Sequence, residues 1–275
     1  MAGLAHATRI IDVDGAATAE IDPDWSIWGP IGGYVAAIAL RGAGSIAPPG
    51  HRPVTFSCQF LSRANPAAVQ VEAVTIKAGS TACHNVTLTQ DGRAFLQAQV
   101  WTTSKNAGPS RSDLTMPDVP AANTLESFAD QMSRLGRELA GFWTLIDGRQ
   151  VDFRPTGDAD PRGCRTERWL RIIEWHATPD PFLEAARALI GIDTHIWPAH
   201  IRGLDALPSY VAPSLDLTVW FHTAAPEAEW QLVEARSEVS GEGLMAGTAR
   251  LWSSDGVLVA SGGSQCLIVP IKPGR

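Results

Sequence analysis

The chain has 275 residues, of which 45% are hydrophobic, and it contains ten tryptophans. This length and composition predict one large or two ordinary globular domains with an ample apolar core and no long disordered span. The formal net charge is −7 at pH 7. An acidic chain offers no basic surface to phosphate backbones, so nucleic-acid binding is disfavoured and small or neutral ligands are favoured.

The four cysteines lie far apart, with no Cys-x-x-Cys pair and no histidine at zinc-ligand spacing. This pattern favours a reduced, cytoplasmic setting. The N-terminal residues carry no basic patch followed by an apolar stretch, and no apolar run approaches the ~18 residues that span a bilayer. We therefore expect neither a signal peptide nor a membrane anchor.

Two segments begin the predicted fold. Residues 9–14 and 18–21 form an expected hairpin, and residues 31–41 are apolar around the whole circumference of an expected helix. A helix of that kind has to be buried on most sides. Gly32 and Gly33 stand at its start, where they admit two interpretations: close approach of a ligand to the backbone amides, or tight helix packing.

Alternating segments that predict a run of strands follow at 54–61, 69–77, 82–89 and 94–102. The last two are separated by Asp91-Gly92, a strong hairpin signal. Residues 103–120 are rich in Ser, Pro, Asn and Gly and predict a linker.

An amphipathic helix is expected beyond the linker. Asn123-Thr-Leu-Glu126 resembles a capping box, and a stripe of apolar residues runs from Leu125 to Phe142. A connector packed over the sheet is favoured over a substrate lid. Residues 151–155 and 168–175 are the expected first strands of the second half, with a polar loop over 156–165 between them.

The second half holds the strand around which the chain is organised. Residues 181–190 repeat apolar side chains at helical spacing, and the pattern stops at Gly191. From Ser214 to His222 every second residue is apolar, which predicts a central strand with one face on a core. Further strands are expected at 230–239, 244–252 and 256–261.

The two halves form an internal repeat. Each has a helix, a strand, two strands separated by a glycine-containing break, and an Asp-Gly turn before the last strand. The repeat predicts an α+β fold in which one helix and one mostly antiparallel sheet occur twice. We place an N-terminal domain at 1–104, a linker with the amphipathic helix at 105–148, and a C-terminal domain at 149–275.

Several segments of this repeat resemble a known family, the bacterial acyl-CoA thioesterase II proteins, and the resemblance covers nearly the whole chain. The segments are Gly32-Gly33-Tyr34, residues 56–63, residues 214–222, and residues 255–261 with Gln265. The most specific is the Ser-Leu-Asp-x-x-x-Trp-Phe-His strand, followed by Asp-Gly-x-Leu-Val-Ala-Ser. The resemblance implies a double hotdog, in which two long helices are each wrapped by a curved antiparallel sheet.

The resemblance also implies a catalytic site. In that family a water molecule is held by an Asp after the second helix, a Ser or Thr at the start of the next strand, and a Gln on the last strand. By motif position these are Asp193, Ser214 and Gln265. The chain departs from the pattern in two places: Leu217 stands where the family usually has His, and the interval from Ala260-Ser261 to Gln265 is one residue longer.

Thioester hydrolysis needs a positioned water, a base and donors for the oxyanion. We expect Asp193 to be the base, because a place past the C-terminus of helix 181–190 lies at the negative end of the helix dipole, which raises the pKa. Ser214 and Gln265 would aim the water. The amide of Gly33 would stabilise the oxyanion across the interface between the halves.

Further residues receive smaller roles. Trp28 and Trp197 are candidate walls of an acyl tunnel, beside Gly32 and Gly33 as substrate contacts, and Asp216 is expected to form structural hydrogen bonds. Cys266 is expected to be buried as a small hydrophobe. His195 and His200 could share a helix face but have no evident third metal ligand, and no Gly-x-Ser-x-Gly elbow supports a serine nucleophile.

The implied reaction is hydrolysis of fatty acyl-CoA to free fatty acid and CoA, in fatty acid metabolism, without a cofactor. Substrate phosphates would bind Arg or Lys near the pocket mouth. Two alternatives stay open: a hotdog hydratase or dehydratase with an Asp193–His195 acid/base pair, and a non-catalytic acyl-CoA-binding or lipid-binding protein. Because hotdog sheets commonly pair edge to edge, the resemblance also predicts a homodimer of double units.

Overall fold

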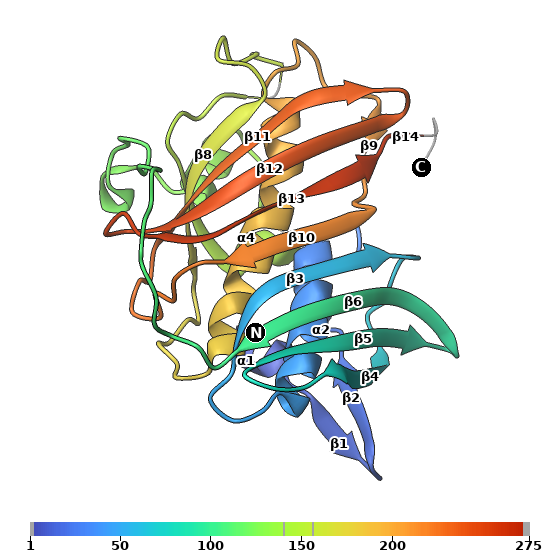
Figure 1. The fold of residues 1–275 in the computed structure, drawn as a ribbon. Helices are drawn as coiled ribbons and strands as arrows, with labels where there is room; N and C mark the ends of the chain where they lie inside the picture. Colours follow the sequence, from blue (N-terminus) through green and yellow to red (C-terminus); the bar gives the residue numbers. More distant parts are fainter. Residues whose placement is uncertain (1–2, 140, 156, 272–275) are drawn as a thin grey trace.

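The computed structural model describes residues 3–139, 141–155 and 157–271. Two long helices, α2 (Gly32–Ile46) and α4 (Pro181–Ile201), pack against each other, and a large antiparallel sheet curves around them (Figure 1). The helices and the sheet form the predicted α+β double hotdog.

The first half of the chain supplies one helix of the pair and the strands around it. Its elements are α1 (Leu4–Ala7), β1 (Ile11–Val13), β2 (Ala16–Glu20), a 3-10 turn (Pro23–Trp25), α2, β3 (Arg52–Phe60), β4 (Ala68–Lys77), β5 (Thr81–Gln90) and β6 (Arg93–Thr103). The strands follow the predicted segments closely. Asp91 and Gly92 both have positive φ, +49° and +72°, as the expected Asp-Gly hairpin requires.

The second half begins with short elements and then repeats the pattern. Its elements are 3-10 turns at Ala122–Thr124 and Gly141–Thr144, α3 (Phe128–Arg134), β7 (Ile146–Gln150), β8 (Arg165–Ile172), α4, β9 (Tyr210–Val211), β10 (Asp216–Phe221), β11 (Gln231–Gly241), β12 (Leu244–Ser253), β13 (Leu258–Leu267) and β14 (Val269–Pro270). The two-residue strands β9 and β14 form a separate pair.

The sheet has 12 strands in the order β1-β2-β4-β5-β6-β3-β10-β13-β12-β11-β8-β7. The two halves meet where β3 pairs with β10, and β13 lies on the other side of β10. Leu217 and Val219 of β10 are completely buried. The prediction of a central strand is therefore confirmed, and the edge-to-edge pairing of the two repeats occurs within one chain.

Helix α2 touches α4 through its glycines. A Cβ atom on Gly33 would lie 2.6 Å from the carbonyl oxygen of Leu189 in α4, so only glycine fits at this crossing. The residues from Tyr34 to Leu40 are all buried, as the fully apolar pattern predicted. Tight helix packing, one of the two interpretations of the glycine pair, is confirmed.

The second helix is longer than its sequence pattern indicated. We predicted an end at Gly191, but α4 continues to Ile201. Glycine costs about 1 kcal/mol in a helix interior, and here it is fully enclosed: a Cβ on Gly191 would lie 3.2 Å from the side chain of Leu251. The missing side chain allows β12 to pack close to the helix, so this glycine is a packing site and not a C-cap.

The expected amphipathic helix over 125–142 is wrong in length and in its start. Helix α3 has seven residues, and its N-cap is Ser127, whose hydroxyl accepts the N–H of Asp130 at 3.0 Å. Gly136, with φ +67°, ends it: the N–H groups of Arg137 and Gly136 bond the carbonyls of Met132 and Ser133. This Schellman motif ends the helix, although the apolar stripe continues beyond it.

The first strands of the second half are also shifted from the prediction. Residues 151–155 lie outside the strands, and β7 ends at Gln150. Strand β7 was not predicted because it contains Gly148, and glycine is depleted in strands. The expected polar loop includes residue 156, which is outside the described residues.

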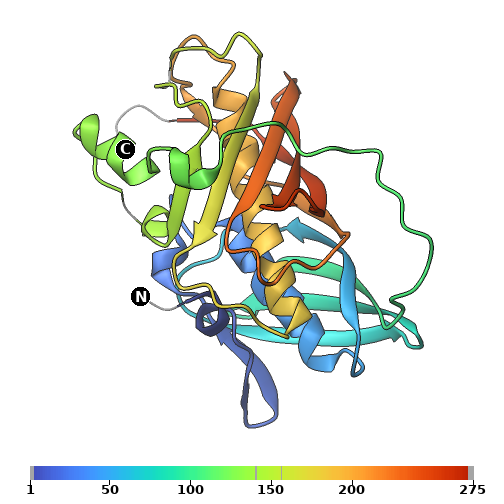
Figure 2. The same cartoon turned by 90° about the vertical axis from the view of Figure 1, so that its left-hand side faces the viewer.

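The linker crosses the outside of the molecule between the two halves (Figure 2). Its final residues cover the outer face of the second half of the sheet, where Met116 and Val119 pack against Trp169 and Trp252. The indole N–H of Trp169 donates to the carbonyl of Pro120 at 2.9 Å. In the described part of the chain, no helix has the length and apolar character needed to cross a membrane.

Candidate active site

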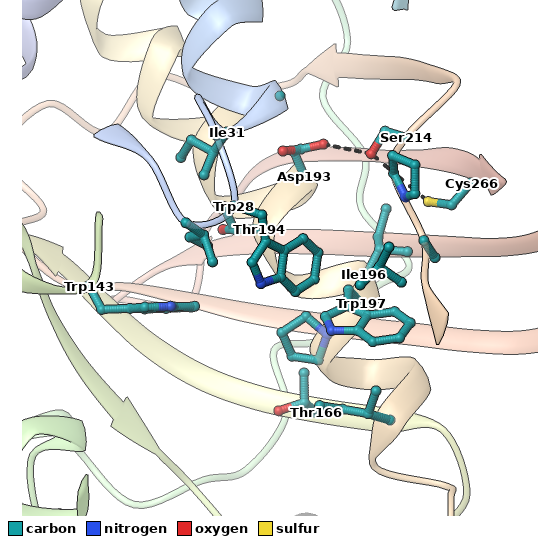
Figure 3. Close-up of a pocket in the computed structure, with 18 of the residues that line it drawn as sticks. Trp28, Ile31, Trp143, Thr166, Asp193, Thr194, Ile196, Trp197, Ser214 and Cys266 are labelled. Atoms are coloured by element: carbon teal, nitrogen blue, oxygen red, sulfur yellow. Dashed lines mark hydrogen bonds between the residues drawn. The ribbon is translucent and has the colours of Figure 1, made fainter. Parts of the chain in front are cut away.

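A cavity of about 1030 Å³ is lined by both halves of the chain. Its wall includes the start of α2, the middle of α4, the beginning of β8, and the residues around the Ser214–Cys266 pair. Figure 3 shows Asp193 and Ser214 at one end of this cavity and Thr166 at the other, with Trp28 and Trp197 between them.

Asp193 is fixed by donors from two directions. Its Oδ2 accepts the backbone N–H of Gly33 at 2.7 Å, and its Oδ1 accepts the hydroxyl of Ser214 at 3.1 Å (Figure 3). Gly33 belongs to the first half, whereas Asp193 and Ser214 belong to the second. The structure therefore brings together three of the residues singled out in the sequence.

Burial raises the pKa of Asp193, and the hydrogen bonds from Gly33 and Ser214 oppose that rise. The helix dipole is not the cause that we expected. Asp193 lies inside α4, about two turns before Ile201, and the dipole effect falls off within the last turn. The carboxylate is made more basic by its removal from water.

Gln265 is not brought to this site. Its side chain is exposed, and its backbone N–H donates to Asp216 Oδ1 at 2.7 Å. Its neighbour Cys266 forms a bridge pair with Ser214 and lines the cavity, with its Sγ 3.9 Å from Ser214 Oγ. Asp216 has the structural hydrogen-bonding role that we expected.

The register of β13 accounts for the different positions of Gln265 and Cys266. Side chains alternate across a strand, so a shift of one residue moves every following side chain to the opposite face. Cys266 thus occupies the cavity-facing position opposite Ser214. Sequence reasoning missed it as a site residue, although the longer interval was the signal. Burial raises the pKa of its thiol, which keeps the group neutral.

The two glycines at the start of α2 differ in their surroundings. The N–H of Gly33, our expected oxyanion donor, is already bonded to Asp193 in this structure. Gly32 lines the cavity, and a Cβ there would lie 3.0 Å from Asp193 Oδ1. The absence of a side chain at Gly32 leaves room for a small group directly beside the carboxylate.

The predicted tryptophans both contribute to the cavity wall. The rings of Trp28 and Trp197 meet edge to face with centroids 6.2 Å apart, and Trp28 is 57% exposed. They form an apolar surface between the carboxylate end and the far end of the cavity (Figure 3).

The histidines of α4 face elsewhere. His195 is completely buried outside the cavity wall, its Nδ1 lies 2.8 Å from the carbonyl of Gly191, and burial lowers its pKa to about 3. His200 Nε2 lies 2.8 Å from the hydroxyl of Tyr210. Across the described ranges, no three His, Cys, Asp or Glu side chains cluster as metal ligands.

Two protein-family models match the sequence. A model described as the acyl-CoA thioesterase N-terminal domain matches residues 21–103, and one described as the C-terminal domain matches residues 117–268. The chain belongs to the acyl-CoA thioesterase family. This thioesterase is accordingly a thioester hydrolase, with one family domain in each hotdog.

Solved structures similar to this thioesterase share its fold. A hot dog fold protein from Alicyclobacillus acidocaldarius is 22% identical, with a TM-score of 0.80 over 96% of this chain and 97% of the other. An acyl-CoA thioesterase II from Mycobacterium marinum is 18% identical, with a TM-score of 0.77 over 99% and 100% of the two chains. A search of curated proteins gives no match.

Proposed function

We propose that this thioesterase hydrolyses fatty acyl-CoA with a water molecule activated by Asp193 and Ser214. The observation that carries the proposal is a carboxylate on the cavity wall, bonded by Gly33 and Ser214 and given a raised pKa by burial. A carboxylate whose pKa lies closer to neutral is a better general base.

In the proposed reaction, Asp193 takes a proton from water while the water oxygen attacks the thioester carbonyl carbon. The negative charge that develops on the carbonyl oxygen is stabilised by a backbone N–H at the start of α2, where Gly32 borders the cavity, while the N–H of Gly33 stays bonded to Asp193. The C–S bond then breaks, and the departing CoA thiolate receives the proton from Asp193. The acid product and CoA leave without a covalent intermediate.

The surroundings of Cys266 and His195 disfavour two other reactions at this site. Cys266 has a raised pKa and would be a neutral thiol, which is a poor nucleophile. A hydratase would need an acid/base pair, and His195 is buried away from the cavity wall with a pKa of about 3. Water activation by Asp193 is the chemistry that these groups support best.

We further propose that the acyl chain lies along Trp28 and Trp197, and that exposed Arg63 and Arg137 on the cavity wall bind the phosphates of CoA. We propose a cytoplasmic role in fatty acid metabolism, in keeping with the free state of all four cysteines, Cys58, Cys83, Cys164 and Cys266.

The test is release of free thiol from short, medium and long acyl-CoAs by the wild type, Asp193→Asn and the control Asp216→Asn. Asp216 is a carboxylate at the start of β10, and it is not part of the cavity wall. We expect turnover to fall about 100-fold or more in Asp193→Asn and to persist in the control. Full activity of Asp193→Asn would refute the assignment of the base.

A further inference from the structure

The cavity holds an arginine that the proposed hydrolysis does not use. Arg168 of β8 is only 3% exposed and lines the cavity. Its Nε and Nη1 atoms are buried, and neither has a hydrogen-bond partner among the described residues. The ion pairs of the described residues likewise do not include Arg168, although most other buried charges take part in one.

Aromatic rings hold the guanidinium in place. Its central carbon lies 4.5 Å from the ring centroid of Phe128 and 5.2 Å from that of Trp143. Such cation–π contacts fix the plane of an arginine but leave its N–H donors free. The donors of Arg168 are therefore positioned without being satisfied.

Two neutral polar side chains share this end of the cavity. Gln150 pairs with Arg168 across β7 and β8, so the two side chains leave the sheet on the same face, and Gln150 Oε1 is buried without a partner among the described residues. Thr166 lies two residues before Arg168 on the same face of β8. All three line the cavity.

Nearby carboxylates do not neutralise Arg168. Asp152 and Asp160 pair with Arg202, and Asp158 pairs with Arg154. Each of these acids therefore has another arginine as its partner. The guanidinium of Arg168 faces the cavity as an uncompensated positive charge.

The physical chemistry of this position points to an anionic ligand. Burial, reinforced by the charge of Arg202, lowers the pKa of Arg168 to about 9, so the side chain remains protonated at neutral pH. Burying a charge without a partner is costly, and a strongly perturbed charged group in a cavity is a candidate functional group. A planar guanidinium matches a carboxylate or phosphate through two parallel hydrogen bonds.

We propose that Arg168 binds a carboxylate at the far end of the acyl chain, so that the preferred substrates are ω-carboxyacyl-CoA thioesters. This inference rests on the proposed function, because it places the thioester at Asp193 and Ser214. Figure 3 shows Trp143 and Thr166, which flank Arg168, well separated from these two residues, with the tryptophan surface between. An acyl chain with an acid at its end would contact both polar ends and the apolar middle.

A phosphate of CoA is the other source of an anionic partner. Phosphates are strongly hydrated, and the exposed arginines Arg63 and Arg137 are available to them on the cavity wall. Arg168 is instead enclosed by aromatic rings, where the terminal group of a chain fits better than a nucleotide. We therefore favour the acyl carboxylate, and the experiment separates the two sources.

The experiment compares kcat/KM for ω-carboxyacyl-CoAs, from succinyl-CoA to sebacyl-CoA, with methyl-ended acyl-CoAs of the same lengths. We expect a preference for the carboxylated series at one or more lengths. In Arg168→Met the ratio between the two series should fall about 100-fold, as expected when one partner of a buried ion pair is removed. An unchanged ratio would overturn the proposal.

Thioesters of pantetheine, which lack the nucleotide and its phosphates, identify the source of the anion. If Arg168 binds the acyl carboxylate, the effect of Arg168→Met on the ratio persists with these substrates. If Arg168 binds a CoA phosphate, the variant loses activity equally on both CoA series, and the loss disappears with pantetheine thioesters. That second result would overturn the proposal.

A binding measurement tests the carboxylate site independently of the proposed hydrolysis. Free adipate, suberate and sebacate are titrated into the wild type, and the shift in unfolding temperature is recorded. Stabilisation that is lost in Arg168→Met supports the carboxylate site even if no thioester is hydrolysed. If no dicarboxylate stabilises the wild type more than the variant, the site is refuted whatever the catalytic result.

Two further variants serve as a control for the loss of a positive charge and as a substitute if Arg168→Met does not fold. Arg93 is exposed at the start of β6, away from the cavity wall, so Arg93→Met should leave the substrate ratio unchanged. If Arg168→Met does not fold, Arg168→Lys keeps the charge but loses the planar fork, and its ratio should still fall, by a smaller factor. A ratio equal to that of the wild type in Arg168→Lys would count against bidentate binding and overturn the proposal in that case.

Discussion

At the scale of single residues, two opposing effects act on the pKa of Asp193. Its removal from water favours the protonated acid, whereas the N–H of Gly33 and the hydroxyl of Ser214 favour the carboxylate. Burial is the larger effect, so the pKa is raised. The same two donors orient the carboxylate, which leaves its remaining lone pairs for a water molecule.

The raised pKa predicts the acid side of the pH–rate profile. As the pH falls through the pKa of Asp193, the carboxylate gains a proton and the base is lost. Activity should therefore decline at a pH above the ordinary aspartate value of 3.8. The measurement is kcat/KM against pH for the wild type and for the residual activity of Asp193→Asn. An acid limb that is the same in both would assign the ionisation to another group.

The alternation of side chains on β13 predicts that substitutions at Ser214 and Gln265 affect hydrolysis differently. Ser214→Ala removes a hydrogen bond to Asp193 and should lower kcat by about 10-fold or more. Gln265→Ala alters an exposed side chain outside the cavity wall and should leave kcat and KM unchanged. Steady-state kinetics of the two variants check this contrast. Equal losses in both would contradict the observed register.

At the scale of elements, the contact between α2 and α4 assembles the site. The close approach at Gly33 and Leu189 places the first turn of α2 beside the middle of α4, which allows the Gly33 N–H to reach Asp193. The packing interpretation and the functional interpretation of the glycine pair are therefore linked. The helices have to touch for the carboxylate to be bonded from both halves.

This contact gives a stability prediction. In Gly33→Ala the new Cβ would meet the backbone oxygen of Leu189 at 2.6 Å, and backbone atoms on both sides cannot move aside cheaply. We expect a loss of about 1–3 kcal/mol in the free energy of unfolding, with a parallel loss of activity. Denaturant unfolding measures it. Gly108→Ala is the control, because a Cβ there meets nothing within 4 Å, and equal stability of both variants would contradict the proposed contact.

At the scale of the whole molecule, the two repeats share one core. A single cluster of buried apolar residues extends from Leu4 to Ala260, and the sheet continues without a break from β3 to β10. The hydroxyls of Ser57 and Thr218 lie 2.9 Å apart across that junction. The largest buried cluster is therefore built from both halves.

The shared core predicts cooperative unfolding. Although 275 residues could form two independent domains, we expect tryptophan fluorescence and far-ultraviolet circular dichroism to follow the same denaturant transition, because neither half can expose its core alone. Two separated transitions would show that the hotdogs unfold independently. The predicted homodimer is a separate matter and stays a prediction.

The sequence by itself determined the repeat, most of the strands and the buried helix α2, because strand alternation and the apolar circumference of that helix are local properties of the chain. It also selected Asp193 and Ser214 through motif positions. Tertiary packing decided the rest. Gly191 and Gly136 look alike as possible helix ends, yet only Gly136 has a positive φ and ends a helix.

The site likewise depends on contacts between segments that are far apart in the sequence. The register of β13 places Cys266 on the cavity wall and leaves Gln265 exposed, and the pairing with Ser214 reveals that register. The unpartnered state of Arg168 was also invisible in the sequence, since charged groups far apart in the chain decide whether a buried arginine is neutralised. Residue types set the available chemistry, and the packing of distant segments chose which groups share one cavity.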